Sequence, residues 1–229
     1  MFFGTRLPNP DSTSDPEWHE WDTFIEKEGI PTCDEEVVRC YQNLEERPYY
    51  LSASLLNHQL NLRHHGKVGA YSKLAEAPYG LDDDEEDYPA TATAHALEAV
   101  FSTKSCRFTA DSVVYKGVNM EPFYEIHSFG SVGQGALIEF PGFLSTSVCR
   151  EKALDFVGRD GVLLVIRGLD QLDCIVPQNS SIKTTKNSEV PEHEVLLGRR
   201  AKMRVERLVP KSTSGPLEVH LQVVGALPV

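Results

Sequence analysis

The segment Phe-Leu-Ser-Thr-Ser at residues 143–147 places three hydroxyl side chains at the end of a short apolar run. Two other polar segments have the same setting. Val-Val-Tyr-Lys-Gly at residues 113–117 carries a basic residue, and Glu-His-Glu at residues 192–194 carries two carboxylates and leads into Val-Leu-Leu. Short apolar runs of this kind are typical of buried strands. We therefore expect a base, hydroxyls and carboxylates to meet in one cleft, which suits chemistry that develops positive charge on an anionic cofactor.

The size and composition of the chain are those of a globular protein. Its 229 residues fit one domain, or one domain with an extension, and 41% are hydrophobic and 24% charged. No run of about 18 apolar residues is present, so we expect no membrane-spanning helix. The first residues lack the basic region and the long apolar stretch of a signal peptide.

The charge and the cysteines restrict the partners. A net charge of -12 argues against nucleic acid as the partner, because binding to phosphates needs clustered Lys and Arg. The negative charge is compatible with a basic protein partner, or it indicates no more than an acidic solvent-exposed surface. The five cysteines are odd in number and form no Cys-x-x-Cys motif. This pattern indicates neither a metal site nor a disulfide framework, and it favours a reducing compartment.

Periodicity divides the chain into three parts and predicts an α+β fold. Residues 1–17 are rich in Pro, Ser, Asp and Asn, which predicts a flexible leader. Residues 18–104 form a helical N-terminal portion and residues 105–229 a strand-rich core, and we expect residues 18–229 to be one domain. Helices are expected near residues 18–24, 34–44, 53–62, 91–102 and 151–157, and strands near residues 113–115, 143–147, 161–166, 174–176, 194–197, 203–209 and 217–224. The acidic run at residues 82–87 predicts an exposed loop or a partner-facing tip.

Taken one at a time, the three polar segments are weak indicators of a site. Glu192 and Glu194 project to the same side of a strand, and like charges this close raise the pKa of at least one carboxyl. Ser145 lacks the surrounding glycines of a hydrolase nucleophile elbow. Most lysines such as Lys116 are simply solvated.

In combination, the segments resemble the mono-ADP-ribosyltransferases of the Arg-Ser-Glu class, which includes clostridial-type toxins and bacterial effectors. That family has Tyr-Arg-Gly or a similar sequence at a strand end, then Gly-Phe-Leu-Ser-Thr-Ser, then Glu-x-Glu before Val-Leu-Leu. This chain has Tyr-Lys-Gly at residues 115–117, Gly-Phe-Leu-Ser-Thr-Ser at residues 142–147 and Glu-His-Glu at residues 192–194. The resemblance covers roughly residues 90–225.

The resemblance implies an ADP-ribosyltransferase-like fold in which two small packed sheets form a cleft for NAD, the substrate. Glu194 would be catalytic and would stabilise the positive charge on the ribose, Ser145 would orient Glu194, and Glu192 would orient or deprotonate the acceptor. Five positions would contact the cofactor besides Lys116: Gly117, Thr146, Ser147, Phe156 and Arg159. The polar segment at residues 177–191 would recognise a protein substrate, with an arginine favoured as the acceptor.

Lys116 departs from the family pattern, which has arginine there. A lysine keeps the charge but loses the planar fork that makes two directed hydrogen bonds. Losing one such bond costs roughly 1–3 kcal/mol, or about one to two decades in affinity. Three outcomes of this exchange therefore stay open: a slower transferase, a transferase with altered cofactor placement, and an interaction module that only binds a partner. A further alternative is an NAD glycohydrolase, in which the same carboxylate serves water as the acceptor.

The family also suggests a biological setting. A single transferase domain without a signal peptide fits a secreted bacterial effector that acts in a host cytoplasm, and otherwise a cytoplasmic protein. We expect a monomer that acts on a protein and binds neither nucleic acid, nor membrane, nor metal.

Overall fold

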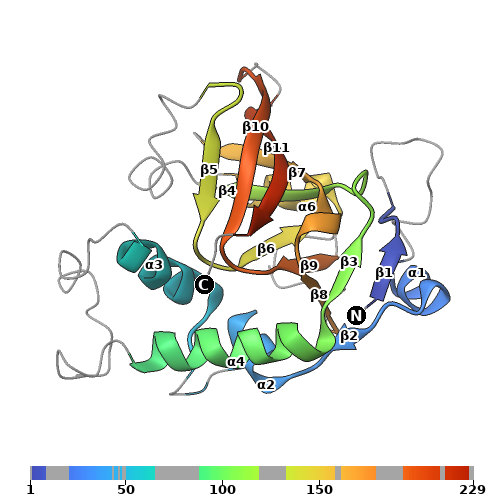
Figure 1. The fold of residues 1–229 in the computed structure, drawn as a ribbon, viewed down its shortest axis with the longest axis vertical. Coiled ribbons are helices and arrows are strands. Elements are labelled where there is room, and N and C mark those ends of the chain that lie inside the picture. The colour runs from blue at the N-terminus through green and yellow to red at the C-terminus, as the bar shows by residue number, and fades with distance from the viewer. Residues whose placement is uncertain are drawn as a thin grey trace.

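The computed structural model describes residues 2–8, 21–42, 44–45, 47, 50–64, 88–118, 133–157, 161–178, 193–211 and 215–226. Glu192, Arg159, the acidic run 82–87 and most of the predicted recognition segment 177–191 lie outside these residues. The described residues form helices and a large mixed sheet, which confirms the α+β class (Figure 1). None of the described helices is long and apolar enough to cross a membrane.

The strands follow one hydrogen-bonded path in the order β1-β3-β8-β9-β6-β4-β7-β11-β10-β5, and β2 pairs with β8. In chain order the strands are β1 (Phe2–Thr5), β2 (Thr32–Cys33), β3 (Cys106–Phe108), β4 (Val114–Val118), β5 (Leu137–Phe140), β6 (Leu144–Ser147), β7 (Val162–Arg167), β8 (Cys174–Pro177), β9 (Glu194–Leu197), β10 (Ala201–Val209) and β11 (Leu217–Ala226). The path has two halves, which join through the single residue pair Tyr115 and Ser147 of β4 and β6. This junction places β4, β6 and β9 next to one another in the middle of the path.

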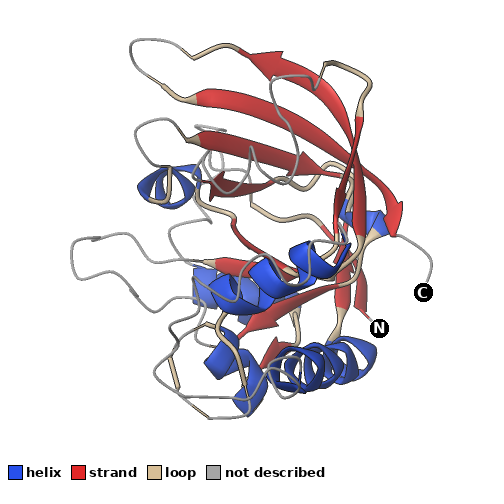
Figure 2. Ribbon diagram, turned by 90° about the vertical axis from the view of Figure 1, so that its left-hand side faces the viewer, coloured by secondary structure: helices blue, strands red, loops and turns tan. Residues whose placement is uncertain are grey.

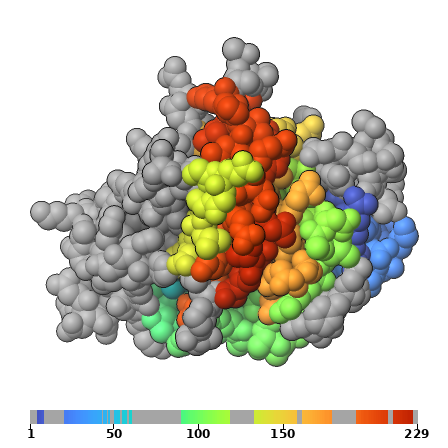
Figure 3. All heavy atoms as spheres, turned by 45° about the horizontal axis from the view of Figure 1, so that its top comes forward, coloured from blue at the N-terminus to red at the C-terminus, as the bar shows by residue number. Residues whose placement is uncertain are grey.

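The helices cover different parts of the sheet. They are α1 (Trp21–Glu28), α2 (Glu36–Tyr41), α3 (Ala53–His64), α4 (Tyr88–Lys104) and α6 (Arg150–Asp155), with a 3-10 turn at Leu169–Gln171. Helices α2 and α4 lie along the half of the sheet that contains β8 (Figures 1 and 2). Helix α1 contributes Trp21, Phe24 and Ile25 to the core cluster that also contains residues of β3. Helix α6 packs on β4 and β6. On the other half, β5, β10 and β11 form one side of the surface (Figure 3).

Apolar packing explains why these helices stay on the sheet. One core cluster joins α2, α3 and α4 to the strands, and its buried members include Val38, Leu56, Leu97, Phe143 and Leu196. Burying side chains of this size contributes about 1.5–3 kcal/mol each. The helical N-terminal portion is therefore packed against the strands that carry the predicted site.

Most predicted elements are confirmed, and two details are wrong. The predicted strands and helices are all present, and Trp21 and Phe24 face the core as their spacing indicates. However, Phe2–Thr5 form β1, which pairs in parallel with β3, so a flexible leader is the wrong description of these residues. Helix α2 ends at Tyr41, so Leu44 lies beyond it.

Candidate functional site

Strand register brings Ser145 and Glu194 together. Strands β6 and β9 are antiparallel, with Ser147 opposite Glu194 and Ser145 opposite Leu196. Because side chains alternate between faces, Ser145, Ser147 and Glu194 project to the same side, and Ser145 is a diagonal neighbour of Glu194. The residue before β9, His193, has a positive φ of 45°, so the chain turns sharply as it enters the strand at Glu194.

The Glu194 carboxylate is buried and held at both oxygens. Glu194 is only 3% exposed to solvent. The Ser145 hydroxyl donates to Oε1 at 2.5 Å, and the Gln42 amide Nε2 donates to Oε2 at 2.6 Å. Burial raises the pKa of Glu194, while the two hydrogen bonds and the positive charge of Lys116 oppose that rise. The group is therefore a desolvated carboxylate with a fixed orientation.

Lys116 on β4 supplies the positive charge near Glu194. Its ammonium Nζ donates to the backbone carbonyl oxygen of Ser145 at 2.9 Å. Burial lowers the pKa of Lys116 to about 8, and the Glu194 charge counteracts part of that effect. The base, the hydroxyl and the carboxylate predicted from the sequence thus form one connected group: Lys116 binds the backbone of Ser145, and the side chain of Ser145 binds Glu194.

The other two hydroxyls of the segment bind backbone groups. Thr146 Oγ1 donates to the Val195 carbonyl oxygen at 2.5 Å, across the β6–β9 pair. Ser147 Oγ accepts a hydrogen bond from the Cys149 amide at 2.9 Å, just before α6 begins. Both hydroxyls therefore fix the backbone around Ser145, and their predicted contact with a cofactor stays a prediction.

Phe156 lies against Gly117, next to Lys116. A Cβ atom added to Gly117 would be 2.0 Å from the Ala153 carbonyl oxygen and 3.0 Å from Phe156 Cβ, so α6 and β4 approach this closely only because residue 117 is glycine. The Phe156 side chain stays 48% exposed. The Lys152 ammonium lies 5.3 Å from the centre of its ring, which is within the range of a cation–π contact. The structure thus brings Phe156 and Gly117 together, and their predicted contact with a cofactor stays a prediction.

Gln42 is the residue of this site that the sequence did not reveal. It lies at the C-terminal end of α2, and 152 positions separate it from Glu194. A glutamine within the helix predicted near residues 34–44 carries no signal for a carboxylate contact, because only the packing of α2 on the sheet creates the contact. Among the described residues, no group of three His, Cys, Asp or Glu side chains is able to hold a metal ion.

The lowered pKa of Lys116 predicts a dependence of stability on pH. A folded-state pKa of about 8, against the ordinary lysine pKa of 10.5, means that the unfolded chain binds more protons between these pH values. Stability contributed by Lys116 therefore rises as the pH increases from about 8 to 10.5. The difference in the free energy of unfolding between the wild type and Lys116→Met, measured by urea denaturation, should shift in favour of the wild type over this interval. Parallel curves for the two proteins would contradict the burial of the Lys116 ammonium.

Neither a protein-family model nor a curated protein sequence matches this chain. Solved structures do match. The C3 exoenzyme of Clostridium limosum has 16% sequence identity, coverage of 97% of this chain and 97% of its own, and a TM-score of 0.57. The ADP-ribosyltransferase Vis, in complex with agmatine, has 15% identity, coverage of 95% and 88%, and a TM-score of 0.57. C3larvin toxin, an ADP-ribosyltransferase from Paenibacillus larvae, has 16% identity, coverage of 95% and 99%, and a TM-score of 0.51. The chain therefore has the ADP-ribosyltransferase fold of the bacterial toxins, as its motifs predict.

Proposed function

We propose that the chain is an NAD-dependent protein mono-ADP-ribosyltransferase. The observation that carries the proposal is the Glu194 carboxylate, which is desolvated, held at both oxygens and close to the Lys116 charge. Such a preorganised charge stabilises a developing positive charge far better than a solvated carboxylate does. The ADP-ribosyltransferase fold supports the same activity.

In the proposed reaction the bond between nicotinamide and ribose breaks, and its electron pair leaves with nicotinamide. The acceptor forms a new bond to the same ribose carbon and gives up a proton. Glu194 stabilises the positive charge that develops on the ribose, as carboxylates do in glycoside cleavage. Each carboxylate oxygen accepts more than one hydrogen bond, so a ribose hydroxyl can bind Glu194 beside its two protein donors. Ser145 orients Glu194, and Glu192 orients the acceptor or takes its proton.

The residues around Lys116 and Phe156 fit NAD. Phe156 offers an exposed aromatic ring against which the nicotinamide can pack. Lys116, together with Arg159, supplies positive charge for the phosphates, and Gly117, Thr146 and Ser147 form the strand ends beside it. NAD supplies an activated ribose carbon. The protein residues bind and orient NAD and stabilise the charge that develops on its ribose.

We further propose that the acceptor is an arginine of a host protein and that the chain is a secreted bacterial effector. The Glu-x-Glu pair at residues 192–194 supports an arginine acceptor, since a second carboxylate can bind a guanidinium in a bidentate manner. The complex of Vis with agmatine, itself a guanidinium compound, is consistent with this acceptor. Residues 177–191 would contact the substrate protein.

A second candidate function is that of an interaction module that binds a partner without catalysis. The observation that favours it is the position of the Lys116 ammonium, which donates to the Ser145 carbonyl oxygen rather than presenting a two-pronged donor to a ligand. The acidic net charge of -12 suits a basic partner.

Incubation with labelled NAD and a eukaryotic cell extract separates the two functions. A transferase labels protein bands with the wild type and not with Glu194→Ala. Labelling only by Lys116→Arg would show that the site of the wild type is intact but no longer binds NAD, which would support the interaction module. Absence of labelling in every version, together with no NAD binding by calorimetry, would rule out the proposed activity.

Removing the ring of Phe156 should weaken NAD binding. Phe156→Ala keeps Cβ, and with it the contact to Gly117, but loses the aromatic face, so we expect an affinity about tenfold lower. Calorimetric titration with NAD measures the change. The matched control is Leu137→Ala on β5, which removes another exposed apolar side chain, 52% exposed, and should leave the affinity unchanged. Equal losses in both variants would argue against a nicotinamide contact at Phe156.

A further inference from the structure

Gln42 is the one residue of the described site that comes from the helical N-terminal portion. Its amide donates to Oε2 of Glu194 at 2.6 Å, while Ser145 from the sheet donates to Oε1 at 2.5 Å. We propose that Gln42 is a positioning residue that fixes the orientation and the charge state of Glu194, so that helix α2 is part of the catalytic machinery. This inference rests on the proposed transferase function.

The geometry explains why two donors are needed. A carboxylate with a single donor at one oxygen can still rotate about the bond that joins it to the side chain. With donors at both oxygens from two different elements, the Glu194 carboxylate has one orientation. Transition-state stabilisation depends on such preorganisation, since a misplaced charge has to reorient during the reaction.

The orientation of the Gln42 amide follows from the charge that it faces. Turned the other way, the amide would place its own oxygen against the Glu194 carboxylate, and two acceptors repel each other. The Gln42 Oε1 atom is buried and has no hydrogen-bond partner among the described residues. An amide with one orphaned acceptor costs free energy, which the charge-assisted bond from Nε2 to Glu194 offsets.

Helix α2 is fixed to the same strand segment that carries Ser145. The Tyr41 hydroxyl, directly before Gln42, donates to the Phe143 carbonyl oxygen at 3.2 Å and accepts from Asn57 Nδ2 at 2.9 Å. Val38 and Tyr41 are buried against the strands. The two donors to Glu194 are thus held in a common frame, although Gln42 and Ser145 are distant in the sequence.

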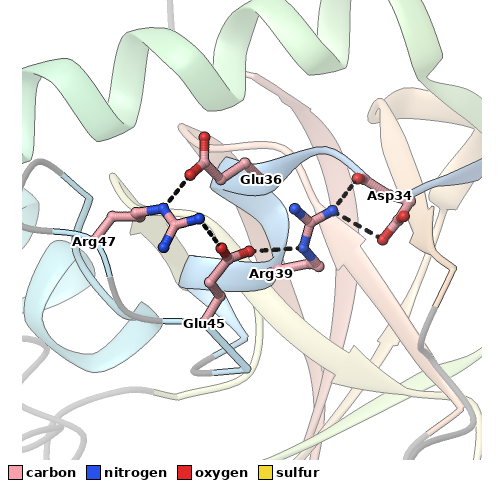
Figure 4. A network of polar contacts seen from close by, with 5 residues as sticks. All are labelled: Asp34, Glu36, Arg39, Glu45 and Arg47. Carbon is pink, nitrogen blue, oxygen red and sulfur yellow. Dashed lines mark hydrogen bonds and ion pairs between the residues drawn. The ribbon is translucent and has the colours of Figure 1, made fainter.

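Ion pairs on the outer side of α2 hold the residues that follow Gln42. Arg39 contacts Asp34 at 3.1 Å and Glu45 at 2.9 Å, and Arg47 contacts both Glu36 and Glu45 (Figure 4). Each exposed pair contributes little on its own, but the network connects residues before and after Gln42. It therefore restricts the turn in which Gln42 lies.

The test compares Gln42→Met, which keeps the length of the side chain and removes the donor, with Gln222→Met on β11. Gln222 is also half-buried, and within the part of the chain that the structure describes its amide donates to the neighbouring Val223 carbonyl oxygen, at 3.4 Å. For Gln42→Met we expect kcat to fall about ten- to a hundredfold with little change in KM. The hydrogen bond from Gln42 lowers the pKa of Glu194, so its removal should raise that pKa. The acid limb of the pH–rate profile of this variant should therefore move to higher pH. Gln222→Met should behave as the wild type, and thermal melting should show that both variants are folded.

A second readout does not depend on activity. Carboxyl carbon NMR of protein labelled at Glu follows the titration of Glu194, whose signal is the one missing from Glu194→Gln. We expect this titration to move to higher pH in Gln42→Met, and further in Gln42→Glu, which places a second negative charge there. An unchanged titration in both variants would overturn the role of Gln42. A shifted titration in these variants, combined with a wild type that transfers no ADP-ribose, would uphold the positioning by Gln42 and refute the proposed function instead.

Discussion

Glu194→Gln should lower the rate of nicotinamide release from NAD by about a hundred- to a thousandfold. The amide keeps the size of the carboxylate but removes the negative charge that the reaction uses, and losses of this magnitude follow removal of one preorganised electrostatic group. The fold should persist, since an uncharged group costs less to bury than the carboxylate does. Initial rates of nicotinamide release by chromatography, with thermal melting in parallel, measure both effects.

The control for this substitution is Glu206→Gln, which removes an exposed carboxylate from β10. It changes the net charge of the protein by the same amount and should leave the rate unchanged. A Glu194→Gln protein that is folded and releases nicotinamide at the wild-type rate would place the chemistry elsewhere.

Gly117→Ala should destabilise the protein by about 3 kcal/mol or more and abolish measurable NAD binding. The added methyl group would lie 2.0 Å from a backbone oxygen of α6 and 3.0 Å from Phe156, so helix α6 has to move away from β4. That movement displaces Phe156 and disturbs Lys116, the neighbour of Gly117. Urea denaturation measures the stability, and calorimetry measures NAD binding.

Gly133→Ala is the matched control, because a Cβ atom at Gly133 meets nothing within 4 Å. We expect its free energy of unfolding to stay within about 0.5 kcal/mol of the wild type. Similar losses in the two variants would show that the close approach of α6 to β4 is unimportant.

Local patterns in the sequence predict the strand part of the site well. The apolar runs around Ser145 and Glu194 and the one ending at Lys116 are short and bounded by Gly or polar residues, and they form β6, β9 and β4. The alternation of side chains then places Ser145 and Glu194 on one face as soon as the two strands pair. These contacts were predictable because they depend on register more than on distant packing.

Other features depend on contacts that no local pattern encodes. Gln42 reaches Glu194 across 152 positions, and the ammonium of Lys116 binds a backbone oxygen, which any residue could provide. Strand β1 is short and gains its partner only where β3 lies parallel to it, so composition alone suggested a leader. The motifs therefore located the charged groups, and the packing of α2 and the ends of the strands decided how those groups are held.

Mass spectrometry of an acceptor incubated with NAD and the purified protein distinguishes transfer of ADP-ribose from hydrolysis of NAD. Agmatine and proteins labelled in the extract are the acceptors, and Glu194→Gln is the comparison. We expect ADP-ribose on a guanidinium group of the acceptor with the wild type, and none with Glu194→Gln. NAD consumed at equal rates by both proteins, or an acceptor left unmodified while the wild type hydrolyses NAD with water, would contradict this expectation.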